Sequence, residues 1–235
     1  MKKLVIIPTY NERDNVARMI DKVLSLDGDF HLLFVDDGSP DGTATIIKEH
    51  QAQTPERIHL IERSGKLGLG TAYIAGFRWA LERGYDHIFE MDCDFSHNPD
   101  DLLRLNRRLT EDADVVIGSR YVKGVNVVNW PLSRLLMSYF ASKYVRIVTG
   151  MPVCDATAGF VGYRRDVLKD IDLGKVQMVG YGFQIEMKYT AWRHGFTIAE
   201  ESIIFIDREA GTSKMSSGIF GEAFFGVLRL PWRKL

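Results

Sequence analysis

Two carboxylates at the end of an apolar segment are the first residues in this sequence that could do chemistry. Asp92 and Asp94 follow an apolar run that begins at Ile88, and polar and turn-forming residues continue from there to Pro99. Parallel strands that are covered on both faces read as continuous apolar runs, so the acids are expected at the carboxyl end of a strand. There they could hold a divalent cation through hard oxygen ligands and leave positions open for substrate phosphates. The alternative is that they cap the helix expected after Pro99.

The composition indicates a globular protein with one main domain. With 235 residues, 46% of them hydrophobic and 26% charged, the chain can bury a substantial core. The formal net charge of -1 argues against general nucleic-acid binding, which needs a strong basic excess. Cys93 and Cys154 are too few for a disulfide framework, and the N-terminus leads into a strand, not a cleavable signal. A reducing, cytoplasmic setting is therefore expected. Only peripheral membrane contact is expected, because no stretch approaches the roughly 20 apolar residues that span a bilayer.

The charges are unevenly distributed along the chain. No acidic residue occurs between Asp114 and Asp155. Five basic residues fall in the same interval: Arg120, Lys123, Arg134, Lys143 and Arg146. This segment should therefore attract an anion or an anionic surface.

Strands that alternate with helices predict a parallel, doubly wound sheet of Rossmann-like character. The expected strands are residues 4–8, 30–35, 58–61, 88–91 and 115–117, with further strands at 158–163 and 200–207. Acids or turn residues follow three of them, at Pro8 to Glu12, Asp36 to Ser39 and Asp92 to Asp94. Because the carboxyl ends of parallel strands meet at one edge, these three segments are expected to converge there.

The glycine-rich segment from Gly65 to Thr71 has two interpretations. Glycines ahead of a helix let backbone amides approach a phosphate. The segment fits neither the P-loop nor the dinucleotide fingerprint, however, because no lysine follows its last glycine and it comes after the third strand. Close approach of chain segments near the site is favoured over a phosphate cradle.

Two segments combine apolar and basic residues. Residues 130–150 are expected to form one helix or two, in which aromatic and aliphatic side chains alternate with Arg134, Lys143 and Arg146. Residues 218–235 repeat this chemistry. Both could be core helices with solvated cations, or interfacial helices with apolar groups in lipid and cations toward headgroups. Between them, the expected strand at 200–207 should deliver Arg208 and Lys214 to the sheet edge, where an anion contact is favoured over simple solvation.

Seven short motifs, in this order, resemble the inverting glycosyltransferases of family 2, and within them the polyprenyl (dolichyl) phosphate mannose synthase group. The motifs are PTYNE from Pro8, DDGSPDGT from Asp36, MDCDFSHNP from Met91, GSRY from Gly118, DATAGF from Asp155, GYGFQIEM from Gly180 and IDREAGTSKM from Ile206. The resemblance implies a GT-A type domain over residues 1–215, with interfacial acceptor helices at about 130–150, and an amphipathic helix or tail over 216–235. Many such enzymes continue into transmembrane helices, so this chain is expected to rely on interfacial helices or a separate membrane-anchoring subunit.

The resemblance also implies roles for individual residues. Nucleotide-sugar binding would fall to Pro8, Tyr10, Glu12, Val35, Asp37, Asp92, Cys93, Asp94 and Arg208. A Mg²⁺ or Mn²⁺ ion would be held by Asp92, Asp94 and Ser96, where Ser96 replaces a glutamine found in some members. The acceptor phosphate would be bound by Arg120, Arg134, Ser138 and Lys214. Asp94, Arg120 and Arg134 would be the catalytic residues.

The implied reaction is transfer of mannose from GDP-mannose to a polyprenyl monophosphate (dolichyl or undecaprenyl phosphate) at a membrane surface. A phosphate monoester is already ionised near neutral pH, since its second pKa is about 6, and so needs no general base. One displacement predicts inversion at the anomeric carbon. The alternatives are a polyprenyl-phosphate glucosyltransferase or other hexosyltransferase that uses a UDP-sugar, and a membrane-surface nucleotide-binding adaptor without catalysis.

Overall fold

The computed structural model describes residues 1–178, 180–207 and 224–233. Its centre is a seven-stranded sheet in the order β3-β2-β1-β4-β7-β5-β8. The strands are β1 (Lys3–Thr9), β2 (Phe30–Asp36), β3 (Ile58–Glu62), β4 (His87–Glu90), β5 (Val115–Ser119), β7 (Val161–Arg164) and β8 (Ile198–Ser202). Only β7 runs antiparallel to its neighbours, β4 and β5. The predicted α/β fold with a mainly parallel sheet is confirmed.

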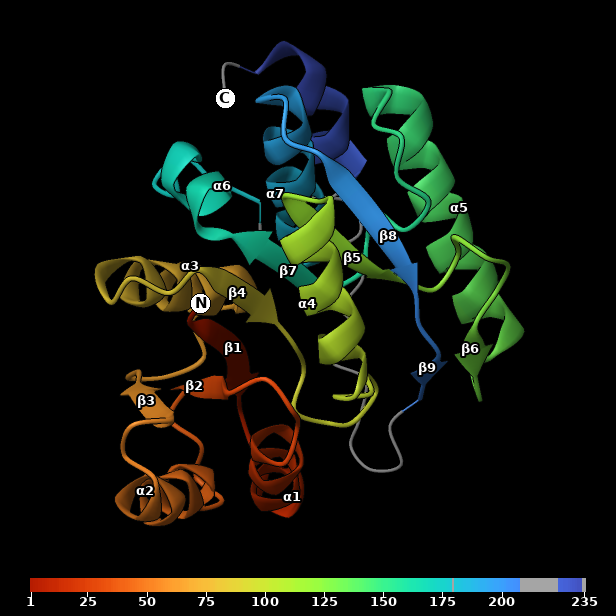
Figure 1. The fold of residues 1–235 in the computed structure, drawn as a ribbon. Coiled ribbons are helices and arrows are strands. Elements are labelled where there is room, and N and C mark those ends of the chain that lie inside the picture. Colours follow the sequence, from red (N-terminus) through yellow and green to blue (C-terminus); the bar gives the residue numbers. More distant parts are fainter. Residues whose placement is uncertain (179, 208–223, 234–235) are drawn as a thin grey trace.

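Helices cover both faces of the sheet (Figure 1). They are α1 (Arg13–Leu24), α2 (Thr43–Gln53), α3 (Leu69–Glu82), α4 (Asp101–Glu111), α5 (Leu132–Thr149), α6 (Arg165–Asp170) and α7 (Tyr181–Arg193). Along β1 the side chains alternate between two cores, because successive residues of a strand point to opposite faces. Leu4 and Ile6 pack with α3 and α7, whereas Val5 and Ile7 pack with α1 and α4.

The chain winds outward from β1 to β3 and then returns to place β4 on the other side of β1. This reversal is a topological switch point, where open α/β sheets bind ligands beyond the carboxyl ends of the strands. The ends of β1, β2 and β4 are therefore adjacent. The predicted convergence of the three polar segments is confirmed.

The last part of the chain differs from the prediction in two places. The strand expected at 200–207 is two strands, β8 and β9 (Phe205–Ile206), which belong to different sheets. The break follows from pairing: β8 lies along β5, whereas β9 pairs with β6 (Val127–Val128). The strand expected at 158–163 begins only at Val161, after the loop that starts at Asp155.

The segment at 130–150 is a single helix, α5, and residues 224–233 pack against it. Residues 224–229 are helical and continue into a 3₁₀ turn, η1 (Leu230–Trp232), which contacts α5. Val227 and Leu230 are buried in the same core as α3 and α7. Both helices therefore present one packed face and one exposed face.

Candidate active site

The ends of β1 and β2 are joined by hydrogen bonds. The hydroxyl of Thr9 donates to Asp36 Oδ2 at 2.8 Å, and the backbone N–H of Asp37 donates to the carbonyl of Thr9 at 3.0 Å. The Asp37 carboxylate in turn accepts from Nε of Arg63 at 2.6 Å. Asp37 is thus fixed at the sheet edge and carries a neutralising partner.

The loop after β1 is tied to the loop after β2. Asn11 has a positive φ of 59°, a conformation that is uncommon for a residue other than glycine. Its N–H donates to Ser39 Oγ and the N–H of Glu12 donates to Thr43 Oγ1, both at 3.0 Å. These bonds hold Tyr10 and Glu12 close to the end of β2. The loop after β1 is therefore held in one position beside the end of β2.

Two other residues predicted to bind the nucleotide are largely inaccessible. Val35 has no exposed surface, and Cys93 is 3% exposed. Burial, together with the charges of Glu12, Asp94 and Asp92, raises the pKa of the Cys93 thiol well above its ordinary value. Val35 and Cys93 therefore lie beneath the surface of the site, and their burial fixes the backbone that carries the neighbouring aspartates.

The acid pair follows β4 in a tight turn. The backbone N–H of Ser96 donates to Asp94 Oδ1 at 3.1 Å, and Phe95 between them has a positive φ of 59°. The side chain of Asp92 is 42% exposed. The positive φ strains the backbone of Phe95, because its side chain is bulky, and such strain concentrates at functional sites. The acids do not cap α4, whose N-cap residue is Asp100.

The acid pair could hold a divalent cation that also binds substrate phosphates. Among the described residues there is no group of three or more His, Cys, Asp or Glu side chains that could hold a metal. Two carboxylates are the usual protein contribution to a Mg²⁺ ion that also binds substrate phosphates. Ser96 is buried, and its hydroxyl has no hydrogen-bond partner in the part of the chain that is described. Its role as a third ligand stays a prediction.

The buried ring of His97 supports the acid pair. Its Nδ1 lies 3.3 Å from the backbone nitrogen of Asp92, which donates to it, and its ring stacks on Phe160 at 5.0 Å between centroids. Burial lowers the pKa of His97 to about 4. The imidazole is therefore neutral near pH 7, and its position is that of a structural support.

Arg120 forms a buried ion pair behind the site. Its Nε and Nη2 reach the two oxygens of Asp155 at 2.7 and 2.6 Å, and Nη2 also reaches the hydroxyl of Thr157 at 2.8 Å. Burial opposes ionisation of Asp155, but the charge and hydrogen bonds of Arg120, together with the charge of Lys188, lower the pKa of Asp155. The bidentate geometry holds the guanidinium in one orientation.

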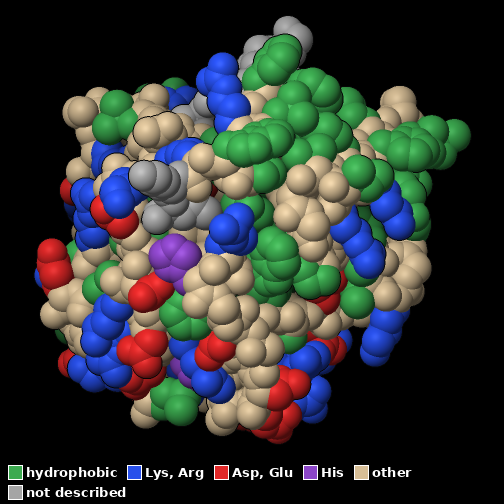
Figure 2. All heavy atoms as spheres, turned by 90° about the horizontal axis from the view of Figure 1, so that it is seen from above, with side chains coloured by type: hydrophobic (Ala, Val, Ile, Leu, Met, Phe, Trp, Pro, Cys, Tyr) green, Lys and Arg blue, Asp and Glu red, His purple; other side chains and the backbone are tan. Residues whose placement is uncertain are grey.

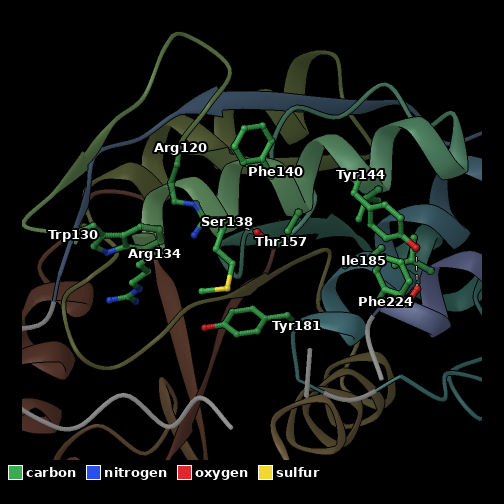
Figure 3. A pocket seen from close by; sticks show the side chains of 14 residues that line it. Arg120, Trp130, Arg134, Ser138, Phe140, Tyr144, Thr157, Tyr181, Ile185 and Phe224 are labelled. Atoms are coloured by element: carbon green, nitrogen blue, oxygen red, sulfur yellow. Dashed lines mark hydrogen bonds between the residues drawn. The ribbon is translucent and has the colours of Figure 1, made fainter. Parts of the chain in front are cut away.

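A cavity of about 380 Å³ opens beside Arg120. Its lining comes from the residue after β5, the segment before α5, α5, α7, the Asp155 loop and residues 224–233. The lining residues are Arg120, Trp130, Arg134, Met137, Ser138, Phe140, Ala141, Tyr144, Val145, Thr157, Tyr181, Ile185, Phe224 and Val227. Figure 3 shows Arg120, Arg134 and Trp130 at one end and Tyr144, Ile185 and Phe224 at the other. The cavity is therefore cationic at one end and apolar at the other.

The other predicted acceptor residues lie at the cationic end. Arg134 stacks over Trp130, 4.1 Å from the ring centroid, and pairs with Asp207 at 2.8 Å. Ser138 accepts a hydrogen bond from the hydroxyl of Tyr121 at 2.9 Å. The structure thus brings Arg120, Arg134 and Ser138 together. Arg208 and Lys214, predicted for the donor and the acceptor, lie outside the described residues.

Several lining residues were not anticipated from the sequence. Tyr144 stacks on Phe224 at 4.8 Å, and its hydroxyl donates to the carbonyl of Phe224 at 3.0 Å, which closes the apolar end. Aromatic residues in both amphipathic segments were a general signal, but it did not show which of them meet. Asp155 belongs to the DATAGF motif, which gives no local signal for its pairing with Arg120.

The glycine-rich segment allows close packing. A Cβ on Gly70 would lie 2.9 Å from the ring of Phe183 on α7, which is closer than real contacts. Lys66 of the same segment lies 5.2 Å above the Tyr10 ring. The preferred interpretation, close approach of chain segments near the site, is confirmed for Gly70.

Sequence comparison identifies the family. The profile described as Glycosyl transferase family 2 matches residues 4–172. The chain belongs to glycosyltransferase family 2. Two relatives are each 47% identical to it. One is a polyprenol monophosphomannose synthase of Mycolicibacterium smegmatis, aligned over 96% of this chain and 85% of the relative. The other is an undecaprenyl-phosphate mannosyltransferase of Micrococcus luteus, aligned over 97% of this chain and 93% of the relative.

A solved structure shares the fold of this family 2 chain. It is a mannosyltransferase from Pyrobaculum calidifontis in complex with GDP-Man and Mn²⁺, with a TM-score of 0.61 and 15% identity over 97% of this chain and 69% of that one. At this identity the likeness supports the fold alone.

Proposed function

We propose that this family 2 glycosyltransferase transfers mannose from GDP-mannose to a polyprenyl monophosphate, with inversion at the anomeric carbon. The observation that carries the proposal is the cavity between α5 and α7, which has arginines at one end and apolar side chains along the rest. An amphiphile with one anionic group and a hydrocarbon chain matches this lining. The names of the two relatives at 47% identity support both the mannosyl group and the lipid phosphate.

The donor half of the site lies at the edge formed by β1, β2 and β4. Tyr10, Glu12 and Asp37 would receive the nucleoside, and Asp92 and Asp94 would face the diphosphate. A divalent cation, Mg²⁺ or Mn²⁺, bound by these two carboxylates would offset the charge that develops on the leaving diphosphate. Without it, the acids would repel the donor, so the residues fit a metal-dependent enzyme.

The acceptor half supplies position and charge. Arg120 and Arg134 would hold the acceptor phosphate, whose ionised oxygen attacks the anomeric carbon directly. Ser138 and Thr157 add hydroxyl groups to the same end of the cavity. The ionised phosphate oxygen needs no base, and His97 is buried and neutral. The site would therefore act through orientation and electrostatic stabilisation.

Arg134→Ala should weaken use of the lipid phosphate selectively. Loss of a charged contact to the phosphate corresponds to a rise in the acceptor KM of roughly tenfold or more, while the KM for GDP-mannose stays within about twofold. Steady-state kinetics with each substrate varied in turn measure the change. Arg107→Ala on α4, an exposed arginine that does not line the cavity, is the matched control. A loss confined to donor binding would contradict the acceptor role of Arg134.

The exposed faces of α5 and residues 224–233 would dock on a membrane. Large apolar side chains stand in solvent there, including Ile147 and Trp232, each 81% exposed, and Phe225 at 61%. Figure 2 shows hydrophobic side chains gathered on this side of the molecule, with Lys and Arg among them. Lys143 and Arg146 lie on α5 in the acid-free segment, which suits anionic headgroups. No helix in the described ranges is long and apolar enough to cross a bilayer.

Replacing Phe225 and Trp232 together by serine should reduce binding to anionic phospholipid vesicles by roughly tenfold or more, because each buries a large apolar surface in the interface. Co-sedimentation with vesicles measures it. Leu103→Ser on α4, another exposed apolar residue, should bind like the wild type. Turnover of a short, water-soluble polyprenyl phosphate should be unchanged in the double variant. Equal vesicle binding by both variants and the wild type would remove this face from the proposal.

A donor screen tests the proposed reaction. Radiolabelled GDP-mannose and UDP-glucose are each incubated with undecaprenyl phosphate and Mg²⁺ or Mn²⁺, and the label in the lipid phase is counted. Label should enter the lipid phase from GDP-mannose. Exclusive use of UDP-glucose would replace the mannosyl assignment by the glucosyl alternative, and transfer from neither donor would favour a non-catalytic adaptor.

The separate membrane-anchoring subunit stays a prediction.

A further inference from the structure

The charge of Arg120 is largely cancelled where it stands. Its guanidinium is paired with both oxygens of Asp155, and its own backbone N–H donates to Asp155 Oδ2 at 2.9 Å. Asp155 has no exposed surface. A guanidinium held this way is well oriented, but its attraction for an incoming phosphate is reduced by the neighbouring carboxylate. The position of Asp155 therefore decides what Arg120 can do.

The loop that carries Asp155 is fixed from two sides. On one side, the Glu200 carboxylate of β8 accepts from the backbone N–H groups of Cys154 at 2.7 Å and Asp155 at 3.0 Å. On the other side, the Lys188 ammonium of α7 donates to the carbonyls of Ala156 at 3.1 Å and Ala158 at 2.6 Å. In both places a charged side chain bonds to two backbone groups of the loop, and we call these two contacts together the clamp. The loop is thereby held by four hydrogen bonds to two charged groups.

Lys188 is an unusual residue to find in this place. It has no exposed surface, and within the described part of the chain its ammonium donates to those two carbonyls. Burying a lysine without a close carboxylate partner is costly, and an apolar residue of similar size is usually the more stabilising choice. Stability alone is thus a poor reason for its presence.

Two buried carboxyl groups, those of Glu90 and Asp155, act on the charge of Lys188. Glu90, at the end of β4, is fully buried and accepts from Gln184 at 2.5 Å. Burial lowers the pKa of Lys188 to about 8, and the charges of Glu90 and Asp155 oppose that effect. The ammonium therefore stays charged behind the Asp155 loop.

We propose that Lys188 and Glu200 are positioning residues for the acceptor phosphate, which fix the Asp155 loop so that Arg120 faces the cavity, with the Lys188 charge offsetting that of Asp155. The proposal rests on the proposed lipid-phosphate acceptor. Neither side chain lines the cavity, so both act through Arg120. The clamp thus places the Lys188 cation at loop carbonyls and the Glu200 anion at loop N–H groups.

Kinetics of Lys188→Met and Glu200→Gln test the clamp. Methionine keeps the length and apolar stem of lysine but cannot donate, whereas glutamine leaves one of the two loop N–H groups without its acceptor. Each variant should raise the KM for undecaprenyl phosphate by roughly tenfold, since a hydrogen bond to a charged group is lost, and leave the KM for GDP-mannose within about twofold. Thr190→Val is the matched control, because Thr190 is a buried polar residue on the same helix, two positions beyond Lys188.

The readouts separate this proposal from a merely structural role and from the proposed function. A structural role predicts a lower melting temperature with both KM values unchanged or changed together, as expected for Thr190→Val. An unchanged acceptor KM in Glu200→Gln and in folded Lys188→Met would overturn the positioning role. If Lys188→Met does not fold, the Glu200→Gln kinetics decide alone. Absence of transfer by the wild-type protein would instead count against the mannosyltransferase function itself.

Discussion

Asp94→Asn should lower mannosyl transfer by about three orders of magnitude, because the variant loses one of the two charges that would hold the cation against the donor diphosphate. The fold should be unaffected, since asparagine still offers an oxygen to the backbone N–H of Ser96. Transfer of radiolabel from GDP-mannose to undecaprenyl phosphate measures the loss. In the wild-type protein, a chelator should remove activity to the same extent, and added Mg²⁺ or Mn²⁺ should restore it.

Asp100→Asn is the control for this substitution. Asp100 lies six residues further along the same loop, and its carboxylate pairs with Lys22 in an exposed salt bridge. That variant should keep wild-type activity. Metal-dependent transfer by Asp94→Asn at the wild-type rate would contradict the donor site described here.

Asp155→Asn should cause the largest loss of stability. It leaves the buried Arg120 guanidinium without its counter-charge, and breaking a buried pair in this way costs about 3–5 kcal/mol of the free energy of unfolding. In a chain of this length the melting temperature should fall by roughly 10 °C. Differential scanning calorimetry measures it. Asp112→Asn, which disturbs the exposed Arg108–Asp112 pair, should have little effect.

Replacing both partners separates stability from function. The double variant Arg120→Met with Asp155→Leu should recover most of the lost stability, because apolar residues often replace a buried ion pair without cost. It should not recover transfer to the lipid phosphate. Recovery of activity together with stability would show that Arg120 serves the fold and not the acceptor.

The convergence of the polar strand ends could be predicted from sequence because its determinants are local. Apolar runs that end in acids mark strand ends, and the parallel topology brings those ends to one edge. The positions of Asp36, Asp92 and Asp94 at this edge could therefore be predicted without any knowledge of long-range contacts. The bonds that join Thr9 to Asp36 are the physical result of that adjacency.

The acceptor half could be predicted only in part, because it depends on pairings between distant residues. The acid-free segment indicated that Arg120 and Arg134 attract anions, but nothing local showed that Arg120 meets Asp155, 35 positions away. The Lys188 clamp was missed for the same reason: one lysine in an apolar helix reads as solvated until the helix is seen to be buried. The break between β8 and β9 depends on the partner strands and has no local signal.

A structure of the protein with GDP, Mn²⁺ and a short polyprenyl phosphate tests the central claim most directly. GDP is expected at the ends of β1, β2 and β4, with its diphosphate and the cation at Asp92 and Asp94. The acceptor phosphate is expected at Arg120 and Arg134, and the first isoprene units along the apolar lining toward Tyr144 and Phe224. An acceptor phosphate bound elsewhere, with the cavity between α5 and α7 left empty of lipid, would contradict this claim.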